Sequence, residues 1–326
     1  MNIPTISAGV EAIPMIRWEA PLDDLQIGPV DAADDLADEE SVVSLATRLA
    51  LSLPCAGDLL EFAARPSPAA ALLVRGVPIG EVGPTPPYPG AREDRWTQPE
   101  LLLLAAARLL GHPIGYAPEH GGRLVQDIVP VKGSETLQVS TSSSGDLMFH
   151  TETAFHPHRP RYLLLLCLRG DPDAATTLLS VAELLAGLDA ATIKTLREPR
   201  FATAVDLSFL GGRRNVHGEP QCVIGGSVQD PTLLFDADLT VGLDPEACRA
   251  TEAVQERIAQ AHRSLVLEAG DLLVVDNARA VHGRSAYCAR YDGTDRWLMR
   301  AFSVADLSPS AADRDGRIIT TVFGDA

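Results

Sequence analysis

His150, Glu152 and His282 are the residues whose types and spacing most clearly indicate chemistry. His150 and Glu152 are separated by a single residue, and His282 lies far downstream in the run DLLVVDNARAVHGRSAY. Two imidazoles and one carboxylate can occupy one face of an octahedral metal ion and leave the opposite face open. This donor set, the facial triad, is typical of non-haem Fe(II) enzymes that activate dioxygen.

The spacing also predicts how the chain presents these donors. On a β-strand, residues i and i+2 point to the same side, so His150 and Glu152 can converge on one ion while Thr151 faces away. The third donor must come from another strand. The apolar run 272–275, with turn residues on both sides, predicts a short buried strand. We expect His282 on a loop just beyond that strand.

Two other classes of metal protein use similar residues. An H-x-E pair opens the zinc deaminase signature, but that signature requires a downstream P-C-x-x-C. None of the five cysteines forms a C-x-x-C pair, which excludes this class. A metal-binding cupin that isomerises or simply binds a ligand remains as an alternative, and oxygen-dependent formation of succinate would distinguish the two.

Arg296 favours the oxygenase interpretation. It follows His282 closely, in the sequence RYDGTDRWLMR. An iron oxygenase that uses 2-oxoglutarate needs a cation for the C5 carboxylate while the 2-oxo acid chelates the metal. A guanidinium suits this task because it is planar and pairs with a carboxylate through two hydrogen bonds. A cupin of the other kind would not need Arg296.

Three segments carry a resemblance to a known family: FHTETAFHPHRPRYLLLLCLRGD, GDLLVVDNARAVHGR and RYDGTDRWLMR. They resemble the clavaminate synthase-like branch of the Fe(II)/2-oxoglutarate-dependent oxygenases, and within it the β-hydroxylases of free amino acids such as arginine. The likeness is dense over residues 124–303. It implies Fe(II), 2-oxoglutarate as co-substrate and O2, with His150, Glu152 and His282 as iron ligands and Arg296 as the co-substrate clamp.

The resemblance also implies further site residues. In that family a threonine shortly after the first ligand pair helps to hold 2-oxoglutarate, and both Thr176 and Thr177 match it. The carboxylate ligand, here Glu152, turns its second oxygen toward the substrate ammonium. An arginine at the position of Arg300 binds the substrate carboxylate, which favours a free amino acid over a carrier-bound one.

The side chain of the substrate is predicted from a group of acidic residues. Asp236 and Asp238 share a face if their stretch is extended, and two carboxylates there could grip a guanidinium or ammonium group. The arginine hydroxylases carry a similar D-x-D, and Asp206 resembles one of their substrate-facing aspartates. Gln126 is a further pocket candidate, or else a buried residue that satisfies the backbone.

These residues predict hydroxylation of an unactivated carbon of L-arginine, or of L-lysine or a related basic amino acid, in specialised metabolite or antibiotic biosynthesis. Asparagine and citrulline stay open as substrates. Desaturation and cyclisation stay open as outcomes on the same iron. Halogenation is disfavoured because it needs the carboxylate ligand vacated for chloride, and Glu152 is present.

The order of elements predicts an α+β protein with a double-stranded β-helix, or jelly-roll, core flanked by helices. We expect one domain over residues 1–326, with an N-terminal helical elaboration over about 1–120, the core over about 121–326 and a lid over about 209–230. The periodicity predicts helices over 41–50, 57–64, 98–110 and 246–267, with Ser180 and Asp189 opening two more. Strands are expected at 71–75, VQDIVPV, LQVSTS, YLLLLCLR and TTLLS, and the Pro-rich stretch 84–95 is expected to form a surface loop.

Composition excludes some partners. The net charge of −17 argues against nucleic acid, since phosphate binding needs a basic patch, so the expected partners are small molecules. No apolar run reaches the roughly 18 residues of a membrane span, and the N-terminus lacks a signal-peptide pattern. The sequence therefore predicts a cytoplasmic protein with reduced cysteines, and it makes no prediction of the oligomeric state.

Overall fold

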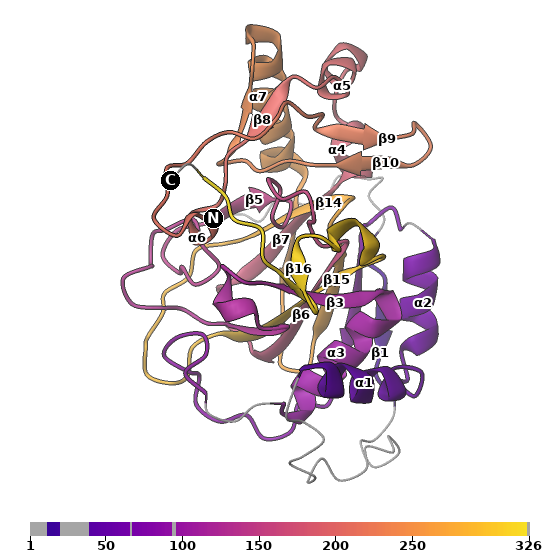
Figure 1. The fold of residues 1–326 in the computed structure, drawn as a ribbon, viewed down its shortest axis with the longest axis vertical. Coiled ribbons are helices and arrows are strands. Elements are labelled where there is room, and N and C mark those ends of the chain that lie inside the picture. The colour runs from indigo at the N-terminus through magenta and orange to yellow at the C-terminus, as the bar shows by residue number, and fades with distance from the viewer. Residues whose placement is uncertain (1–11, 20–38, 66, 93–95, 325–326) are drawn as a thin grey trace.

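The computed structural model describes residues 12–19, 39–65, 67–92 and 96–324. The N-terminus, most of the acidic run 31–40 and the end of the Pro-rich stretch lie outside these ranges. Within them, two β-sheets form the centre of the molecule, helices cover one side, and a further layer of helices and short hairpins lies beyond the smaller sheet (Figure 1).

The larger sheet has nine strands within the described residues. Their order is β1 (Met15–Arg17), β2 (Ala71–Arg75), β13 (Leu272–Asp276), β6 (Tyr162–Arg169), β15 (Trp297–Val304), β3 (His112–Tyr116), β17 (Ile318–Ile319) and β16 (Arg314–Asp315), with β4 (Val125–Ile128) also paired to β15. The central strands β6 and β13 are continuous apolar runs because both faces of the sheet are covered.

Three helices pack on one face of this sheet: α1 (Glu39–Ala50), α2 (Ala56–Ala64) and α3 (Gln98–Leu110) (Figure 1). Helix α3 begins at a capping box in which Thr97 and Glu100 satisfy each other's backbone groups. It ends at Gly111, whose φ of 153° and close approach to the Val304 carbonyl leave no room for a side chain. Its leucines are buried, and each contributes about 1.5–3 kcal/mol through burial.

The smaller sheet has the order β12 (Arg263–Val266), β7 (Ala175–Ser180), β14 (Ala280–Arg284) and β5 (Leu147–His150). Its inner face packs against the other face of the larger sheet, where Leu178 joins a core that includes Leu163 and Phe302. Two facing sheets of largely antiparallel strands are the arrangement expected of a jelly roll. The predicted α+β jelly-roll class is therefore confirmed.

The outer layer follows β7 in the chain. It contains α4 (Val181–Leu185), α5 (Ala190–Leu196), β8 (Phe201–Thr203), α6 (Leu207–Leu210), β9 (Ile224–Gly226), β10 (Pro231–Leu233), β11 (Thr240–Gly242) and α7 (Pro245–Ala261). Ser180 and Asp189 cap α4 and α5 as predicted. None of the helices within the described ranges is long and apolar enough to cross a membrane.

Two predicted elements are wrong. The segment LQVSTS is not a strand, because the chain there coils through turns and the carbonyl of Glu135 accepts the amide protons of residues 143–145. The last predicted helix ends at Ala261 rather than at 267. Residues 263–266 instead pair with β7 as strand β12, so sheet pairing overrides the local helical pattern.

Candidate active site

His150 and His282 are directly opposite one another on neighbouring strands. They are register partners in the β5–β14 ladder, and their ring centroids lie 4.4 Å apart. The prediction that His282 lies on a loop is wrong, because the chain turns tightly at residues 276–279 and enters the smaller sheet at once as β14. His282 thus has a strand on each side and a fixed backbone.

Glu152 reaches the same point from a turn. Strand β5 ends at His150, so the prediction that the two residues share a strand is wrong. The backbone N–H of Glu152 donates to Oδ1 of the buried Asn277 at 2.7 Å, and Asn277 Nδ2 donates back to the Glu152 carbonyl at 3.2 Å. The following residue, Thr153, has a φ of 49° in the left-handed region. Asn277 and this turn aim the carboxylate at the two imidazoles.

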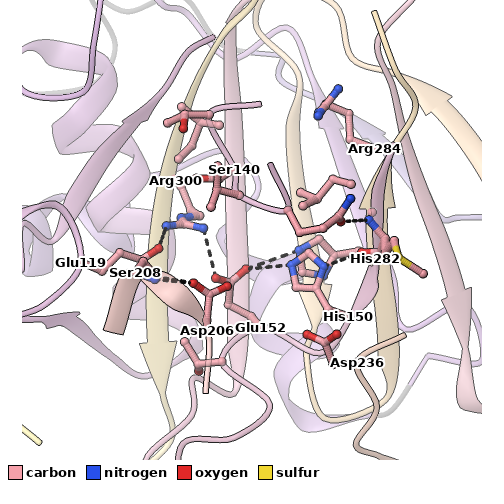
Figure 2. Close-up of a pocket in the computed structure, with 18 of the residues that line it drawn as sticks. Glu119, Ser140, His150, Glu152, Asp206, Ser208, Asp236, His282, Arg284 and Arg300 are labelled. Carbon is pink, nitrogen blue, oxygen red and sulfur yellow. Dashed lines mark hydrogen bonds and ion pairs between the residues drawn. The ribbon is translucent and has the colours of Figure 1, made fainter. Parts of the chain in front are cut away.

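The three donors fit a metal ion. Glu152 Oε2 lies 3.9 Å from His150 Nε2 and 3.4 Å from His282 Nε2, and suitable donor atoms of all three residues lie within 4.8 Å of one another (Figure 2). Adjacent ligands on an octahedral ion with bonds of 2.0–2.1 Å are separated by about 3 Å, so only small movements are needed. His150 Nδ1 lies 2.8 Å from the Met148 carbonyl, which leaves Nε2 free to bind the metal.

The electrostatics of the site favour the metal-binding forms of two donors. Burial alone would raise the pKa of Glu152, but the Arg300 guanidinium and the two imidazoles hold it at about 2. Burial, together with the charge of His150, lowers the pKa of His282 to about 4. A ligating carboxylate must be ionised and a ligating imidazole neutral, and both conditions hold here at neutral pH.

A cavity of about 350 Å³ opens on these donors, and Arg296 lies in its wall. Arg296 is only 5% exposed, and burial lowers its pKa. Its Nη2 approaches Thr176 Oγ1 at 3.5 Å, and no carboxylate of the described residues lies within ion-pair distance of it. A buried guanidinium without an anion fits a bound carboxylate such as that of 2-oxoglutarate.

The two candidate threonines differ in position. Thr176 lines the cavity and contacts Arg296. Thr177 is the next residue on β7, so it points to the other face, and its hydroxyl is buried without a hydrogen-bond partner among the described residues. The geometry therefore favours Thr176 as the residue that accompanies Arg296.

Arg300 is the centre of a buried hydrogen-bond network. Its Nη1 donates to Glu152 Oε1 at 3.1 Å, its Nε donates to Gln126 Oε1 at 2.9 Å, and its Nη2 contacts Glu119. Gln126 supports Arg300 and is not among the residues that line the cavity. Figure 2 shows Arg300 between Glu119 and Glu152, with Asp206 close to the same group. Arg300 thus faces the cavity next to the metal ligands, held on three sides.

The three aspartates predicted from the sequence all line the cavity. Asp206 caps α6 by accepting the Ser208 N–H at 2.8 Å. Asp236 is half-buried beside His150, and burial raises its pKa. The stretch is not extended, because Asp236 Oδ1 accepts the amide protons of Asp238 and Leu239 in a turn. Asp238 is exposed and shares no strand face with Asp236, which corrects the basis of that prediction.

The sequence did not single out four features of this site. Glu119 is buried against Arg300, Asn277 holds Glu152, Arg284 lines the cavity, and the loop that was predicted as a strand forms part of the wall. The Gly-Gly pair that follows His120 could have indicated a turn near Glu119, but no local pattern shows that this turn meets β15. His156 and His158 lie outside the metal group, and His158 pairs with Asp313.

Comparisons with known proteins agree with this geometry. Residues 214–302 match the family model described as taurine catabolism dioxygenase TauD, TfdA family. An L-asparagine oxygenase from Streptomyces coelicolor is 40% identical over 80% of each chain. An L-lysine 3-hydroxylase from Catenulispora acidiphila is 39% identical over 77% of this chain and 72% of its own. An L-ornithine/L-arginine 3-hydroxylase from the same organism is 31% identical over 87% and 92%.

Solved structures are similar over nearly the whole chain. Asparagine oxygenase in complex with Fe(II), 3-hydroxyasparagine and succinate has a TM-score of 0.85 and 32% identity, covering 94% of this chain and 99% of its own. The non-haem iron oxygenase OrfP in complex with iron and 2-oxoglutarate has a TM-score of 0.81 and 33% identity, covering 94% and 100%. The chain belongs to the TauD-type, clavaminate synthase-like family of Fe(II)/2-oxoglutarate-dependent oxygenases, and it is one of the hydroxylases of free amino acids in that family.

Proposed function

We propose that this enzyme hydroxylates C3 of a free basic L-amino acid, with L-arginine as the first candidate and L-lysine as the next, in specialised metabolite biosynthesis. The observation that carries the proposal is the excess of carboxylates around the cavity. Glu119, Asp206, Asp236 and Asp238 lie there in addition to the metal ligand Glu152. Position C3 is taken from the relatives that are named 3-hydroxylases of lysine, ornithine and arginine.

The sum of the charges around the cavity supports a substrate with a basic side chain. Fe(II), Glu152, Arg296 and the dianionic co-substrate together sum to zero, and Arg300 balances the substrate carboxylate. Two cations, the substrate ammonium and Arg284, are then outnumbered by four further carboxylates around the cavity. A cationic side chain reduces this excess, whereas a neutral one leaves the half-buried Asp236 with backbone amide donors but no cation.

The residues divide the work among them. His150, Glu152 and His282 would hold the iron, while Arg296 and Thr176 would hold the C5 carboxylate of 2-oxoglutarate. When bound, iron and 2-oxoglutarate supply the oxidising power that, with dioxygen, replaces a C–H bond by C–OH.

Arg300 orients the substrate through its carboxylate. Glu152 Oε1 already accepts a hydrogen bond from Arg300. This second oxygen of the metal ligand would therefore accept a hydrogen bond from the substrate ammonium. The buried walls exclude water from the reacting carbon.

L-asparagine is the second candidate, because an asparagine oxygenase is 40% identical to this chain. A panel of arginine, lysine, ornithine, citrulline and asparagine, assayed with 2-oxoglutarate and Fe(II), separates the two. Citrulline is the matched control, since it has nearly the shape of arginine without its charge. We expect arginine or lysine to have a kcat/KM at least about tenfold above citrulline, as loss of one charged hydrogen bond implies.

Several outcomes of this panel would count against the proposal. Turnover of citrulline as good as that of arginine, or turnover of asparagine alone, would overturn the basic substrate. Mass spectrometry distinguishes the type of reaction, because hydroxylation adds one oxygen whereas desaturation and cyclisation each remove two hydrogens.

A further inference from the structure

The loop 134–146, which precedes β5, forms one wall of the cavity. Its cavity-lining residues are Ser134, Leu137, Gln138, Val139, Ser140 and Thr141. The loop makes turns around the Glu135 carbonyl and has no strand ladder with either sheet. Its position must therefore be set by individual contacts to the neighbouring elements.

Arg284 supplies three of these contacts from the strand that carries His282. Its Nη2 donates to Ser142 Oγ at 2.9 Å and to the Gly145 carbonyl at 3.2 Å. Its Nη1 donates to the Ser143 carbonyl at 3.2 Å and to the Ser285 carbonyl at 2.8 Å. Figure 2 shows the guanidinium directed away from the three metal ligands, which fits contacts to the loop rather than to the metal.

The burial of Arg284 requires an explanation. It is 4% exposed, and no carboxylate of the described part of the chain lies within ion-pair distance of it. Burial and the charge of Arg296 both disfavour a cation at this place. An apolar side chain would avoid the cost of burying a charge, so the guanidinium is best explained by the hydrogen bonds that its two terminal nitrogens donate. Three of their four acceptors belong to the loop.

We propose that Arg284 is a positioning residue that fastens the loop 134–146 to the strand of His282 and so fixes the wall against which the amino acid substrate lies. The role in substrate binding depends on the proposed function, whereas the role in holding the loop does not. Two backbone contacts remain when Arg284 is replaced, from Tyr287 N–H to the Ser143 carbonyl at 2.8 Å and from Ala286 N–H to Asp146 Oδ1 at 2.7 Å. Replacement should therefore loosen the loop without unfolding the protein.

Hydrogen–deuterium exchange of the protein without metal or co-substrate tests the first role. Arg284→Lys keeps the charge but loses the planar fork, so amides of residues 142–146 should exchange at least about tenfold faster. Ser142→Ala removes one acceptor and should give an intermediate rate. Ser144→Ala is the matched control, since Ser144 is exposed on the same loop. In this variant the loop amides should exchange at the wild-type rate. Wild-type exchange in both Arg284→Lys and Ser142→Ala would overturn the proposal.

Steady-state kinetics test the second role. In Arg284→Lys the KM for the amino acid should rise about tenfold, the KM for 2-oxoglutarate should stay near the wild-type value, and more succinate should form without product. Ser142→Ala should change the same constants in the same direction by a smaller factor. If the loss falls on the KM for 2-oxoglutarate while loop exchange is unchanged, Arg284 belongs to the co-substrate site and the proposal is wrong. Faster loop exchange without turnover of any amino acid would support the role of Arg284 in holding the loop and contradict the proposed substrate class.

Discussion

Replacement of Arg296 should weaken the binding of 2-oxoglutarate, because it removes one contact to the co-substrate. Arg296 is buried, carries no ion pair within the described residues, and touches Thr176 only at 3.5 Å. The co-substrate would therefore provide its one strong partner. A charge-assisted hydrogen bond to a buried group contributes about 1.5–3 kcal/mol, which corresponds to a factor of about 10–150 in binding. Arg296→Ala should raise the KM for 2-oxoglutarate by at least tenfold.

The same interaction energy can be measured by changing the co-substrate in place of the protein. 2-Oxopentanoate has a methyl group where 2-oxoglutarate has its C5 carboxylate. The wild type should prefer 2-oxoglutarate in kcat/KM by a factor in the range of about 10–150, and in Arg296→Ala this preference should fall toward one. Arg296→Lys should recover part of it, because a lysine keeps the charge but cannot form the two-bond pair.

The assay is the rate of formation of succinate from 2-oxoglutarate, or of butanoate from 2-oxopentanoate, at saturating amino acid and varied oxo acid. Thr176→Val is a matched control, because it alters the neighbouring hydroxyl and keeps the guanidinium, and it should reduce the preference less than Arg296→Ala. An unchanged ratio between the two oxo acids in Arg296→Ala would refute the reasoning. The C5 carboxylate would then be bound elsewhere in the cavity.

Three other predictions follow from the site. His150→Ala or His282→Ala should abolish both succinate and product formation, since each removes a metal ligand; near-normal turnover with iron supplied would mean that the ligands are misassigned. Asp236→Ala combined with Asp238→Ala should depress turnover of the basic substrate but leave iron binding and slow uncoupled decay of 2-oxoglutarate intact, and equal loss of all three would contradict a role in recognition. Burial raises the pKa of Glu119 to about 7, so kcat/KM for the amino acid should rise with pH through that value as the carboxylate ionises. This rise should be absent from the pH profile of Glu119→Gln, and a rise that persists in the variant would belong to another group.

The sequence predicted elements whose boundaries are set by local chemistry. The limits of β2, β6 and α3 agree with the predicted ones, because each apolar run is closed by residues that end it, such as Gly111 after α3. It also predicted that His150, Glu152 and His282 come together. Residue types and spacing carry that information even where the predicted local geometry was wrong.

The features that the sequence did not reveal depend on contacts between distant segments. Asn277 holds Glu152 across 125 positions in the chain, and the Glu119 turn meets Arg300 across 181. The aspartates at 236 and 238 alternate as on a strand, yet the carboxylate of the first captures two amide protons and makes a turn. No periodicity within a short window distinguishes these outcomes.

The most direct test of the account is a labelling experiment with 18O2. The iron-loaded enzyme is incubated with 2-oxoglutarate and L-arginine, L-lysine or L-asparagine in turn, and amino acid and succinate are measured together by mass spectrometry. We predict that the basic amino acid gains one labelled oxygen at C3 in proportion to the succinate formed. Labelled product from asparagine but from neither basic amino acid would contradict the proposed substrate, and succinate without oxygen gain in any free amino acid would contradict the central claim.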